Sequence, residues 1–386
     1  MLVQPVTDGP HETPRLVENG IPFISVDAIV DNKIDFSRKR GDVSEEYDAE
    51  CCKKYKPQYH DVYVVKSGST VGKVAIVETT DRFNIWSPLA ALRCEGKTKP
   101  YYLFYLLQTR RMQAQILDKA SNGTQPNLSM RELEKFDVLV TDNAEEQQRI
   151  GDYFKSLDHL ITLHQRKCDE TKELKKFMLQ KMFPKNGEKN PEIRFDGFTD
   201  DWEQRKWIDT VDISTEMVNP ASGEYDEFQH IAPGNIESFT GRILDNVKTV
   251  KEEQLISGKF RFRPGDVVYG KINPQLGKYF YASTDGLTSA DAYVLNGKNG
   301  LTQEFLFSLL QTVDFFKYSI SVSKRSGMPK INRDELNAYS FFAPDEAEQK
   351  KIGTFLLDID HLITLHQRKC EKLKELKKFM LQNMFV

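Results

Sequence analysis

The sequence predicts an α+β chain in which two different β-rich domains are each followed by a nearly identical long helix. The segment DHLITLHQRKC occurs at 158–168 and again at 360–370, which indicates an internal repeat. Weaker similarity continues in the same order on both sides, and both copies have apolar residues at helical spacing. We expect the helices to form an antiparallel coiled coil, with the two domains related by an approximate two-fold axis.

Composition sets the limits of this interpretation. A chain of 386 residues with 39% hydrophobic side chains can build two or more cores. No apolar run is long enough for a membrane span, and no secretory leader is recognisable, so we expect a cytoplasmic protein. The cysteines lack CxxC spacing, which argues against disulfides or a zinc knuckle; they are Cys51, Cys52, Cys94, Cys168 and Cys370.

The net charge of −3 gives no general attraction to nucleic acid or to an anionic membrane. Any DNA binding must therefore come from local basic patches. This charge also leaves open a protein that does not bind DNA at all.

The two domains are predicted from short runs rich in β-branched and aromatic residues, with an apolar helix around each LLQT. The runs are FISV, DVYVV, KVAIV and FDVLV in the first domain, and FRFRP, DVVYGKI, KYFYA and DAYVL in the second. The predicted boundaries are 1–143 for the first domain, 144–184 for the first helix, 185–192 for a linker, 193–344 for the second domain and 345–386 for the second helix.

The long helices carry a coiled-coil seam, because apolar or tolerant residues recur in steps of three and four. The central seam positions are Leu157, Ile161, His164, Cys168, Ile359, Ile363, His366 and Cys370. At about 1.5 Å per residue, each helix is roughly 58 Å long, and its apolar stripe needs a partner. The alternative is that each helix packs only on its own domain.

Several motifs suggest chemistry but lack its requirements. GSTVGKV at 68–74 is too short for a phosphate-binding loop and has no Ser or Thr after the lysine. PDEAEQK at 344–350 is better explained as a capped helix start than as a nuclease site. His164, Cys168, His366 and Cys370 could gather around zinc, but packing in the seam is commoner, and we expect no metal. We find no catalytic constellation.

With the repeat established, the sequence resembles the specificity subunits of type I restriction-modification enzymes over essentially its whole length. The motifs that carry the resemblance are TDGPHETP (7–14), GIPFISVDAI (20–29), KSGSTVGKVAIV (66–77), GTQPNLS (123–129), EEQQRIGDYF (145–154), FDGFTDDWEQRKW (195–207), SGMPKIN (326–332) and EQKKIG (348–353). Each motif is weak alone, but their order and duplication are specific.

The resemblance implies two target recognition domains that each read one half of a split, asymmetric DNA site, with the helix pair setting the unspecified gap. It also implies that the chain has no chemistry and no cofactor of its own. The implied partners are double-stranded DNA, two methyltransferase subunits that use S-adenosylmethionine, and restriction/translocase subunits that use ATP and Mg and attach through the methyltransferase. No membrane is implied. The alternative is a coiled-coil scaffold that does not bind DNA.

One departure concerns the start of the first domain. Only 23 residues precede ISVDAI, and no counterpart of FDGFTDDW stands there, whereas the matching HIAPGNI follows a long segment from Pro191 to Gln229. We therefore expect that the first domain lacks an edge element or that its start is shortened.

Candidate DNA contacts fall on matched loops of the two domains. Ammonium and hydroxyl donors suited to phosphates are Lys66, Ser69, Thr70, Lys73, Lys271 and Lys278. Side chains suited to base edges, because amides pair with adenine and Lys or Arg with guanine, are Asn122, Gln125, Asn127, Lys324, Arg325, Lys330 and Asn332. The alternative for each is an ordinary solvated loop residue.

Overall fold

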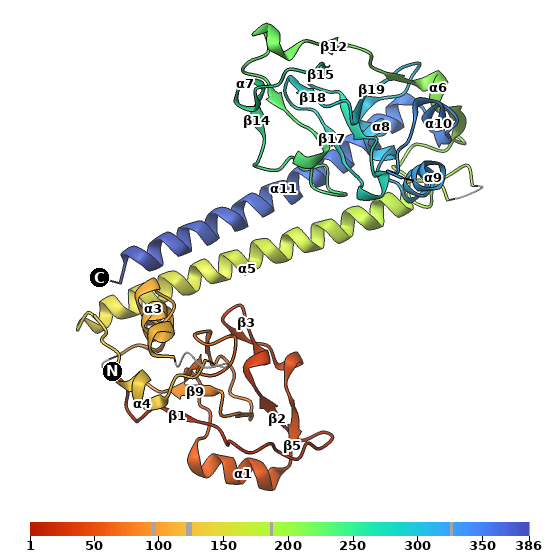
Figure 1. Cartoon of the computed structure of the whole chain (residues 1–386). Helices are drawn as coiled ribbons and strands as arrows, with labels where there is room; N and C mark the ends of the chain where they lie inside the picture. Colours follow the sequence, from red (N-terminus) through yellow and green to blue (C-terminus); the bar gives the residue numbers. More distant parts are fainter. Residues whose placement is uncertain (95–97, 121–125, 186–187, 325–326, 386) are drawn as a thin grey trace. The chain divides into compact units, whose positions relative to one another are not determined.

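A computed structural model describes residues 1–94, 98–120, 126–185, 188–324 and 327–385. The chain divides into two compact units, which are described separately. The first unit comprises 1–163 and 369–386, and the second comprises 164–368. Each unit therefore contains a domain and one part of each long helix, α5 (Ala144–Lys181) and α11 (Glu346–Asn383) (Figure 1).

The first unit alternates short strands and helices before α5. Its elements are β1 (Thr7–Asp8), β2 (Ile21–Ile24), β3 (Ile29–Val30), β4 (Lys33–Ile34), β5 (Gly41–Val43), α1 (Glu45–Lys54), β6 (Val62–Val65), β7 (Val74–Ile76), β8 (Asn84–Ile85), β9 (Leu89–Leu92), α2 (Pro100–Leu106), α3 (Arg110–Lys119) and α4 (Met130–Glu134).

The second unit follows the same plan with additional strands. Its elements are β10 (Glu203–Lys206), α6 (Trp207–Thr210), β11 (Val211–Ile213), β12 (Met217–Val218), β13 (Gln229–His230), β14 (Lys248–Thr249), α7 (Val250–Glu253), β15 (Lys259–Phe262), β16 (Val267–Gly270), β17 (Tyr279–Tyr281), β18 (Gly286–Thr288), β19 (Ala292–Gly297), α8 (Gln303–Leu309), α9 (Val313–Ser323), α10 (Arg333–Asn337) and β20 (Ser340–Ala343).

The two units share one sheet topology. The strand order β1-β9-β6-β7 in the first unit is matched by β11-β19-β16-β17 in the second, and all neighbours are antiparallel. A second sheet, β5-β2-β8, is matched by β14-β13-β18, each with one parallel pair, and the second unit extends it with β15 and β12. The repeat predicted from the sequence is thus a repeat of fold, and the α+β prediction is confirmed.

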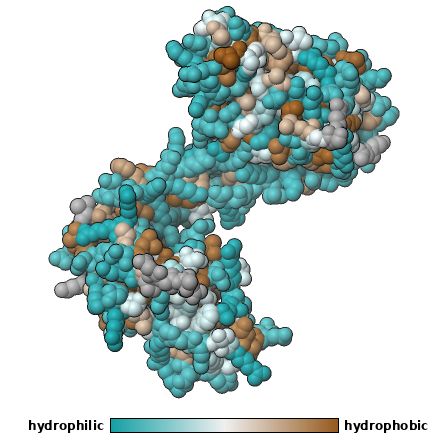
Figure 2. Space-filling view, viewed as in Figure 1, coloured by the Kyte–Doolittle hydropathy of each residue, from teal (hydrophilic) through white to brown (hydrophobic). Residues whose placement is uncertain are grey.

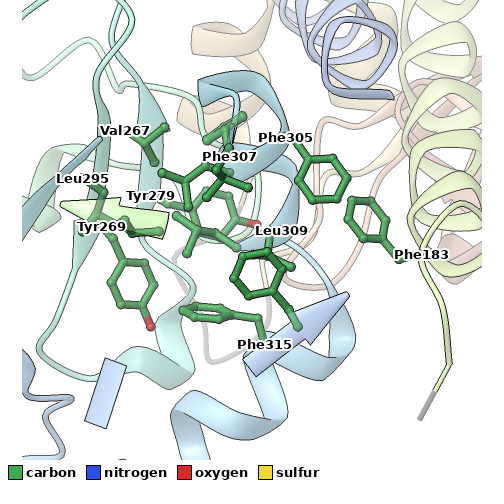
Figure 3. Packing of buried hydrophobic residues seen from close by; sticks show 14 of the residues in the cluster. Phe183, Val267, Tyr269, Tyr279, Leu295, Phe305, Phe307, Leu309 and Phe315 are labelled. Carbon is green, nitrogen blue, oxygen red and sulfur yellow. The ribbon is translucent and has the colours of Figure 1, made fainter. Parts of the chain in front are cut away.

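Each unit has its main core between the four-stranded antiparallel sheet and the helices that follow that sheet in the chain. In the second unit, Val267, Tyr269 and Leu295 of the sheet pack against Phe305, Leu309 and Phe315 of α8 and α9 (Figure 3). Phe183, just beyond α5, adds its ring to Phe305 at a centroid distance of 5.3 Å. In the first unit, Phe385 meets Tyr102 of α2 in the same way, at 5.1 Å.

The long helices run antiparallel wherever they meet within a unit. In the first unit, Phe154 stacks on Phe385, and Asp158 binds Lys377 at 2.7 Å between Oδ1 and Nζ. One turn further along α5, the Cys370 thiol donates to the backbone carbonyl of Ile161. In these contacts the residue numbers rise along α5 as they fall along α11, so the prediction of an antiparallel pair is confirmed. The alternative, that each helix packs only on its own domain, is wrong.

The same direction holds in the second unit, where His164 and His366 lie with their Nδ1 atoms 3.0 Å apart and Lys175 binds Asp360. Lys175 and Asp360 stand at the positions of Lys377 and Asp158 in the other copy. Each copied segment thus supplies an aspartate near its start and receives a lysine from its twin. This reciprocity explains why the same residues recur two hundred positions apart.

Burial shapes this second ion pair. Only 8% of the Lys175 side chain and 19% of the Asp360 side chain are exposed. Removal from water lowers the pKa of Lys175 and raises that of Asp360, and in each case the opposite charge of the partner counters the shift.

One expected strand does not form. Residues 136–140, FDVLV, have no regular secondary structure in the first unit, although their counterparts in the second unit form β20 and pair with β10. A strand needs a hydrogen-bonded neighbour, and the described part of the first unit offers no counterpart of β10. The expectation that the first domain lacks an edge element, or that its start is shortened, stays a prediction. The domain boundaries drawn from the sequence stay predictions.

Within the described residues, no helix combines the length and the apolar character needed to cross a bilayer. The space-filling view shows a face on which hydrophilic residues dominate and brown, hydrophobic residues are scattered (Figure 2).

Candidate nucleic-acid interface

Both units build the same loop pair at one end of the main sheet. In the first unit, the loop after β6 forms a bridge between Ser67 and Asn127, with Gly68 N donating to Pro126 O at 3.0 Å. In the second unit, the loop after β16 bridges Ile272 and Lys330, with Asn273 N donating to Pro329 O at 2.8 Å.

The companion bonds also match: Leu128 N donates to Lys66 O, and Ile331 N donates to Lys271 O. The backbone therefore places Asn127 and Lys330 at equivalent positions, and both are exposed. Their side chains differ in chemistry, because an amide both donates and accepts whereas an ammonium only donates. The structure thus offers one frame with two different functional groups.

Lys330 belongs to a basic cluster. Burial and the charges of Lys330 and Arg333 lower the pKa of Lys271, whose ammonium lies 5.0 Å from the Tyr293 ring centroid. The Arg333 guanidinium donates to the backbone carbonyls of Ile213 and Ser214, at the end of β11, and is held in place by them. An anion near this cluster would relieve the repulsion among its cations.

The other predicted phosphate contacts differ in how exposed their side chains are. Lys73 and Ser69 are exposed, and Thr70 is half-buried. The Lys66 side chain is only 10% exposed, and its ammonium lies 3.2 Å from the buried Asp8 carboxylate. Lys278 donates to the backbone carbonyl of Ile236. Lys66 and Lys278 thus each already bind a group within the chain.

The remaining base-edge candidates also differ. Lys324 is exposed at the end of α9. Asn332 begins α10, where its backbone N–H donates to Glu335 at 2.6 Å in a capping box, as Ser129 begins α4 in the first unit. This bond uses the backbone of Asn332, so a base contact by its side chain stays a prediction. Asn122, Gln125 and Arg325 lie outside the described residues.

Sequence reasoning missed a basic groove in the first unit. A cavity of about 750 Å³ lies between the 71–74 turn, α3 and the last turns of α11. Among the described residues that line it, five are basic and none is acidic: Lys73, Arg110, Lys374, Lys377 and Lys378. From the sequence, only the apolar seam of these helices was assigned a role, and the lysines of KELKK were not. The signal that could have found them is their recurrence in both copies.

The second unit has a smaller groove at the equivalent place, of about 380 Å³. Its lysines, Lys172, Lys175 and Lys176, are the twins of Lys374, Lys377 and Lys378, and Arg242 joins them. Glu173 and Asp360 also line this groove, so its charge is more balanced. The two units thus differ in how strongly they attract anions here.

The seam positions are mainly buried. Leu157, Cys168, Ile359, Ile363 and Cys370 are buried, and Ile161, His164 and His366 are half-buried. Among the described residues there is no cluster of three His, Cys, Asp or Glu side chains arranged for a metal ion. The histidine pair instead makes a hydrogen bond across the two helices in the second unit.

Comparisons with known proteins show the family to which the chain belongs. Residues 12–173 and 199–375 match the family model described as type I restriction modification DNA specificity domain. The EcoDI type I restriction enzyme specificity subunit of Escherichia coli is 32% identical over 151 residues, which are 39% of this chain and 33% of the relative. The matched part thus spans about a third of that relative.

The MjaVIII type I restriction enzyme specificity subunit of Methanocaldococcus jannaschii is 22% identical and covers 83% of this chain and 76% of its own length. The crystal structure of the type I restriction-modification S subunit from M. genitalium has a TM-score of 0.67 at 12% identity, covering 99% of this chain and 93% of that one, which shows a shared fold. Because the family model matches most of the sequence in two blocks, one for each repeat, this chain belongs to the family of type I restriction-modification DNA specificity proteins.

Proposed function

We propose that this chain is the non-catalytic, DNA-reading subunit of a type I restriction-modification complex and that each unit reads one half of a split duplex site. The observation that carries the proposal is the matched bridge that presents Asn127 in one unit and Lys330 in the other. An amide suits adenine and an ammonium suits guanine in the major groove. Two units with the same fold but different base-contacting side chains would recognise an asymmetric site, whose two halves are separated by a fixed number of unspecified base pairs.

Binding strength comes from a different set of side chains. Lys73, Arg110 and Lys374 line the acid-free groove of the first unit and can neutralise phosphates without reading sequence. In the second unit, Lys271 and Lys330 raise the local positive charge beside the reading position. These patches offer local attraction to DNA on a chain whose net charge is −3.

The copied helices suit identical partners. The residues of 158–168 and 360–370 are the same, and both segments keep exposed polar side chains beside the seam. Two copies of one methyltransferase subunit could bind these two surfaces, and restriction subunits would attach through them. S-adenosylmethionine, ATP and Mg would then act on those subunits, with none held by this chain.

The second candidate function is a coiled-coil scaffold that does not bind DNA, which the acidic net charge favours. Selection of random duplexes by the chain assembled with its methyltransferase partners separates the two. The proposal predicts enrichment of two short blocks at one fixed spacing. A scaffold that does not bind DNA would enrich no sequence. Enrichment of a single contiguous block would contradict the proposal that two units each read one half-site.

A matched pair of variants tests the phosphate groove. Lys73→Ala with Arg110→Ala should weaken binding of all duplexes alike and flatten the slope of log affinity against log salt. Lys135→Ala with Arg149→Ala removes the same charge from the first unit at exposed ion pairs outside the groove. If the two pairs of substitutions act alike, the groove has no special role.

A further inference from the structure

The loop bridge of the second unit exposes an apolar side chain beside its basic cluster. Met328 is 67% exposed and stands two residues before Lys330. The turn that follows Ile272, on the other side of the bridge, exposes Leu276 at 44%. A single exposed apolar residue is ordinary on a protein surface, so exposure alone assigns Met328 no role. Its position in the bridge gives it one.

The backbone next to Met328 is anchored on both sides of Lys330. Pro329 O accepts from Asn273 N at 2.8 Å, and Ile331 N donates to Lys271 O at 3.0 Å. A proline also restricts the residue before it to extended conformations, because its ring clashes with the helical alternative. The bridge therefore sets where Met328 stands relative to Lys330.

Met328 and Lys330 lie on the same side of this extended segment. Alternate side chains of an extended chain share one side, and the burial follows that pattern: Met328 and Lys330 are exposed, Pro329 is half-buried and Ile331 is fully buried. Two residues of extended chain span about 6.6 Å, and successive base pairs lie about 3.4 Å apart. With Lys330 on one base edge, Met328 therefore lies against a base pair about two steps away.

The charges around Met328 and its own chemistry together specify what it meets. Lys271 is acted on by the positive charges of Lys330 and Arg333 and by the single negative charge of Asp291, so the cluster attracts a polyanion. An apolar thioether in such a cluster needs an apolar group on that polyanion. In the major groove of duplex DNA this group is the C5-methyl of thymine. The flexible, polarisable side chain of methionine can adapt to it.

We propose that Met328 is a specificity-determining residue that packs on the C5-methyl of a thymine about two base pairs from the base read by Lys330, an assignment that rests on the proposed function and names one base of the site. The first unit differs in sequence, because Gln125 precedes Pro126 where Met328 precedes Pro329. Gln125 lies outside the described residues. The methyl contact is therefore expected in one half of the site only.

The direct test removes the methyl from the DNA. Each thymine of the duplex selected by the native chain, assembled with its methyltransferase partners, is replaced in turn by deoxyuridine, which lacks only the C5-methyl. The native complex should lose affinity about fourfold at one thymine, because one buried methyl contributes about that factor. This thymine should lie in the block that Lys330→Ala alters, and thymines of the other block should show no dependence.

The matching protein variants complete a cycle. Met328→Ala should bind the thymine and deoxyuridine duplexes equally, since the contact is already absent and the two losses are then not additive. Met328→Gln, which installs the residue found before Pro126, should do the same. The control is Met217→Ala, which removes the same side chain from β12 at a similar exposure of 58% and should keep the fourfold dependence.

Three results overturn the methyl contact while leaving two reading units in place. They are two enriched blocks with no methyl dependence in the block that Lys330→Ala alters, a dependence that survives Met328→Ala, and equal weakening of all duplexes by Met328→Ala. The last result would make Met328 a contact that reads no base. Selection that enriches no block at all overturns the proposed function itself, and the methyl contact with it.

Discussion

The two units have the same main sheet, the same helix order and the same loop bridge. They differ at the edge of the sheet and in the side chains that the loop bridge exposes. The second unit pairs β20 with β10 and packs Trp207 in its core, whereas residues 137–140, the counterparts of β20 in the first unit, form no strand. At the loop bridge, Lys330 replaces Asn127. The packing of the main sheet and its helices is therefore kept in both units, while the loop bridge and the sheet edge differ between them.

The largest loss of stability should follow from removing the buried Trp207 side chain from the core of the second unit. Trp207→Ala should lower the free energy of unfolding by about 3–5 kcal/mol, because a fully buried aromatic is removed from a packed core. Denaturant unfolding followed by hydrogen exchange should assign the loss to the second unit. Ile208→Ala, at an exposed neighbour, should change stability by less than about 0.5 kcal/mol; equal losses would contradict the assigned role of Trp207.

The ion pairs between the helices should rank next. Lys175→Met should cost about 3 kcal/mol, because it leaves Asp360 buried without its partner. Lys377→Met should cost less, since 27% of the Asp158 side chain is exposed to water. Denaturant unfolding measures both. Lys175→Met with Asp360→Leu should restore most of the loss, and no restoration would show that the charge left behind is not the cause.

The cost of Lys175→Met should depend on pH with a defined sign. Burial raises the pKa of Asp360 above that of the unfolded chain, and loss of the lysine removes the interaction that opposes this shift. The folded variant therefore takes up a proton before the unfolded one does. Its deficit relative to the native chain should shrink as the pH falls and be largest at neutral pH, as measured by unfolding at pH 4 to 7.

At the loop bridge, Lys330→Ala should cost about 1–3 kcal/mol of binding and relax one base position in one half of the site, if its ammonium reads a base edge. Asn127→Ala should act only on the other half. Competition binding against duplexes altered at single positions measures both effects. Uniform weakening across all duplexes would instead make Lys330 a phosphate contact.

The smallest effect should distinguish two equivalent glycines of the long helices. A Cβ on Gly353 would lie 2.5 Å from the backbone carbon of Glu304, whereas one on Gly151 would lie 3.0 Å from Tyr101 Cβ. Alanine improves helix propensity by about 1 kcal/mol, which offsets part of the crowding. Gly353→Ala should therefore lose about 1 kcal/mol, and Gly151→Ala should be nearly neutral. Thermal unfolding of the two variants compares them directly.

The sequence was most informative where residues are copied. The two nearly identical segments with the same apolar seam predict an antiparallel helix pair, and the structure forms it within each unit, where Lys377 binds Asp158 and Lys175 binds Asp360. FDVLV misled because strand propensity does not supply the neighbour that a strand needs.

Long-range contacts account for what the sequence did not predict. The partner of Lys66 is Asp8, fifty-eight residues earlier, and nothing in the local pattern indicates that contact. The groove of Arg110 and Lys374 joins parts of the chain more than two hundred residues apart. Only folding brings these charges together, so local spacing could not reveal them.

The measurement that tests the central claim most directly is duplex selection with two reciprocal variants, Asn127→Lys and Lys330→Asn, each assembled with the methyltransferase partners. We predict that the native chain enriches two blocks at a fixed gap and that each variant changes one block, a different one in each case, while the gap stays constant. If either variant changes both blocks, or if the native chain yields a single block, the two units are not independent readers.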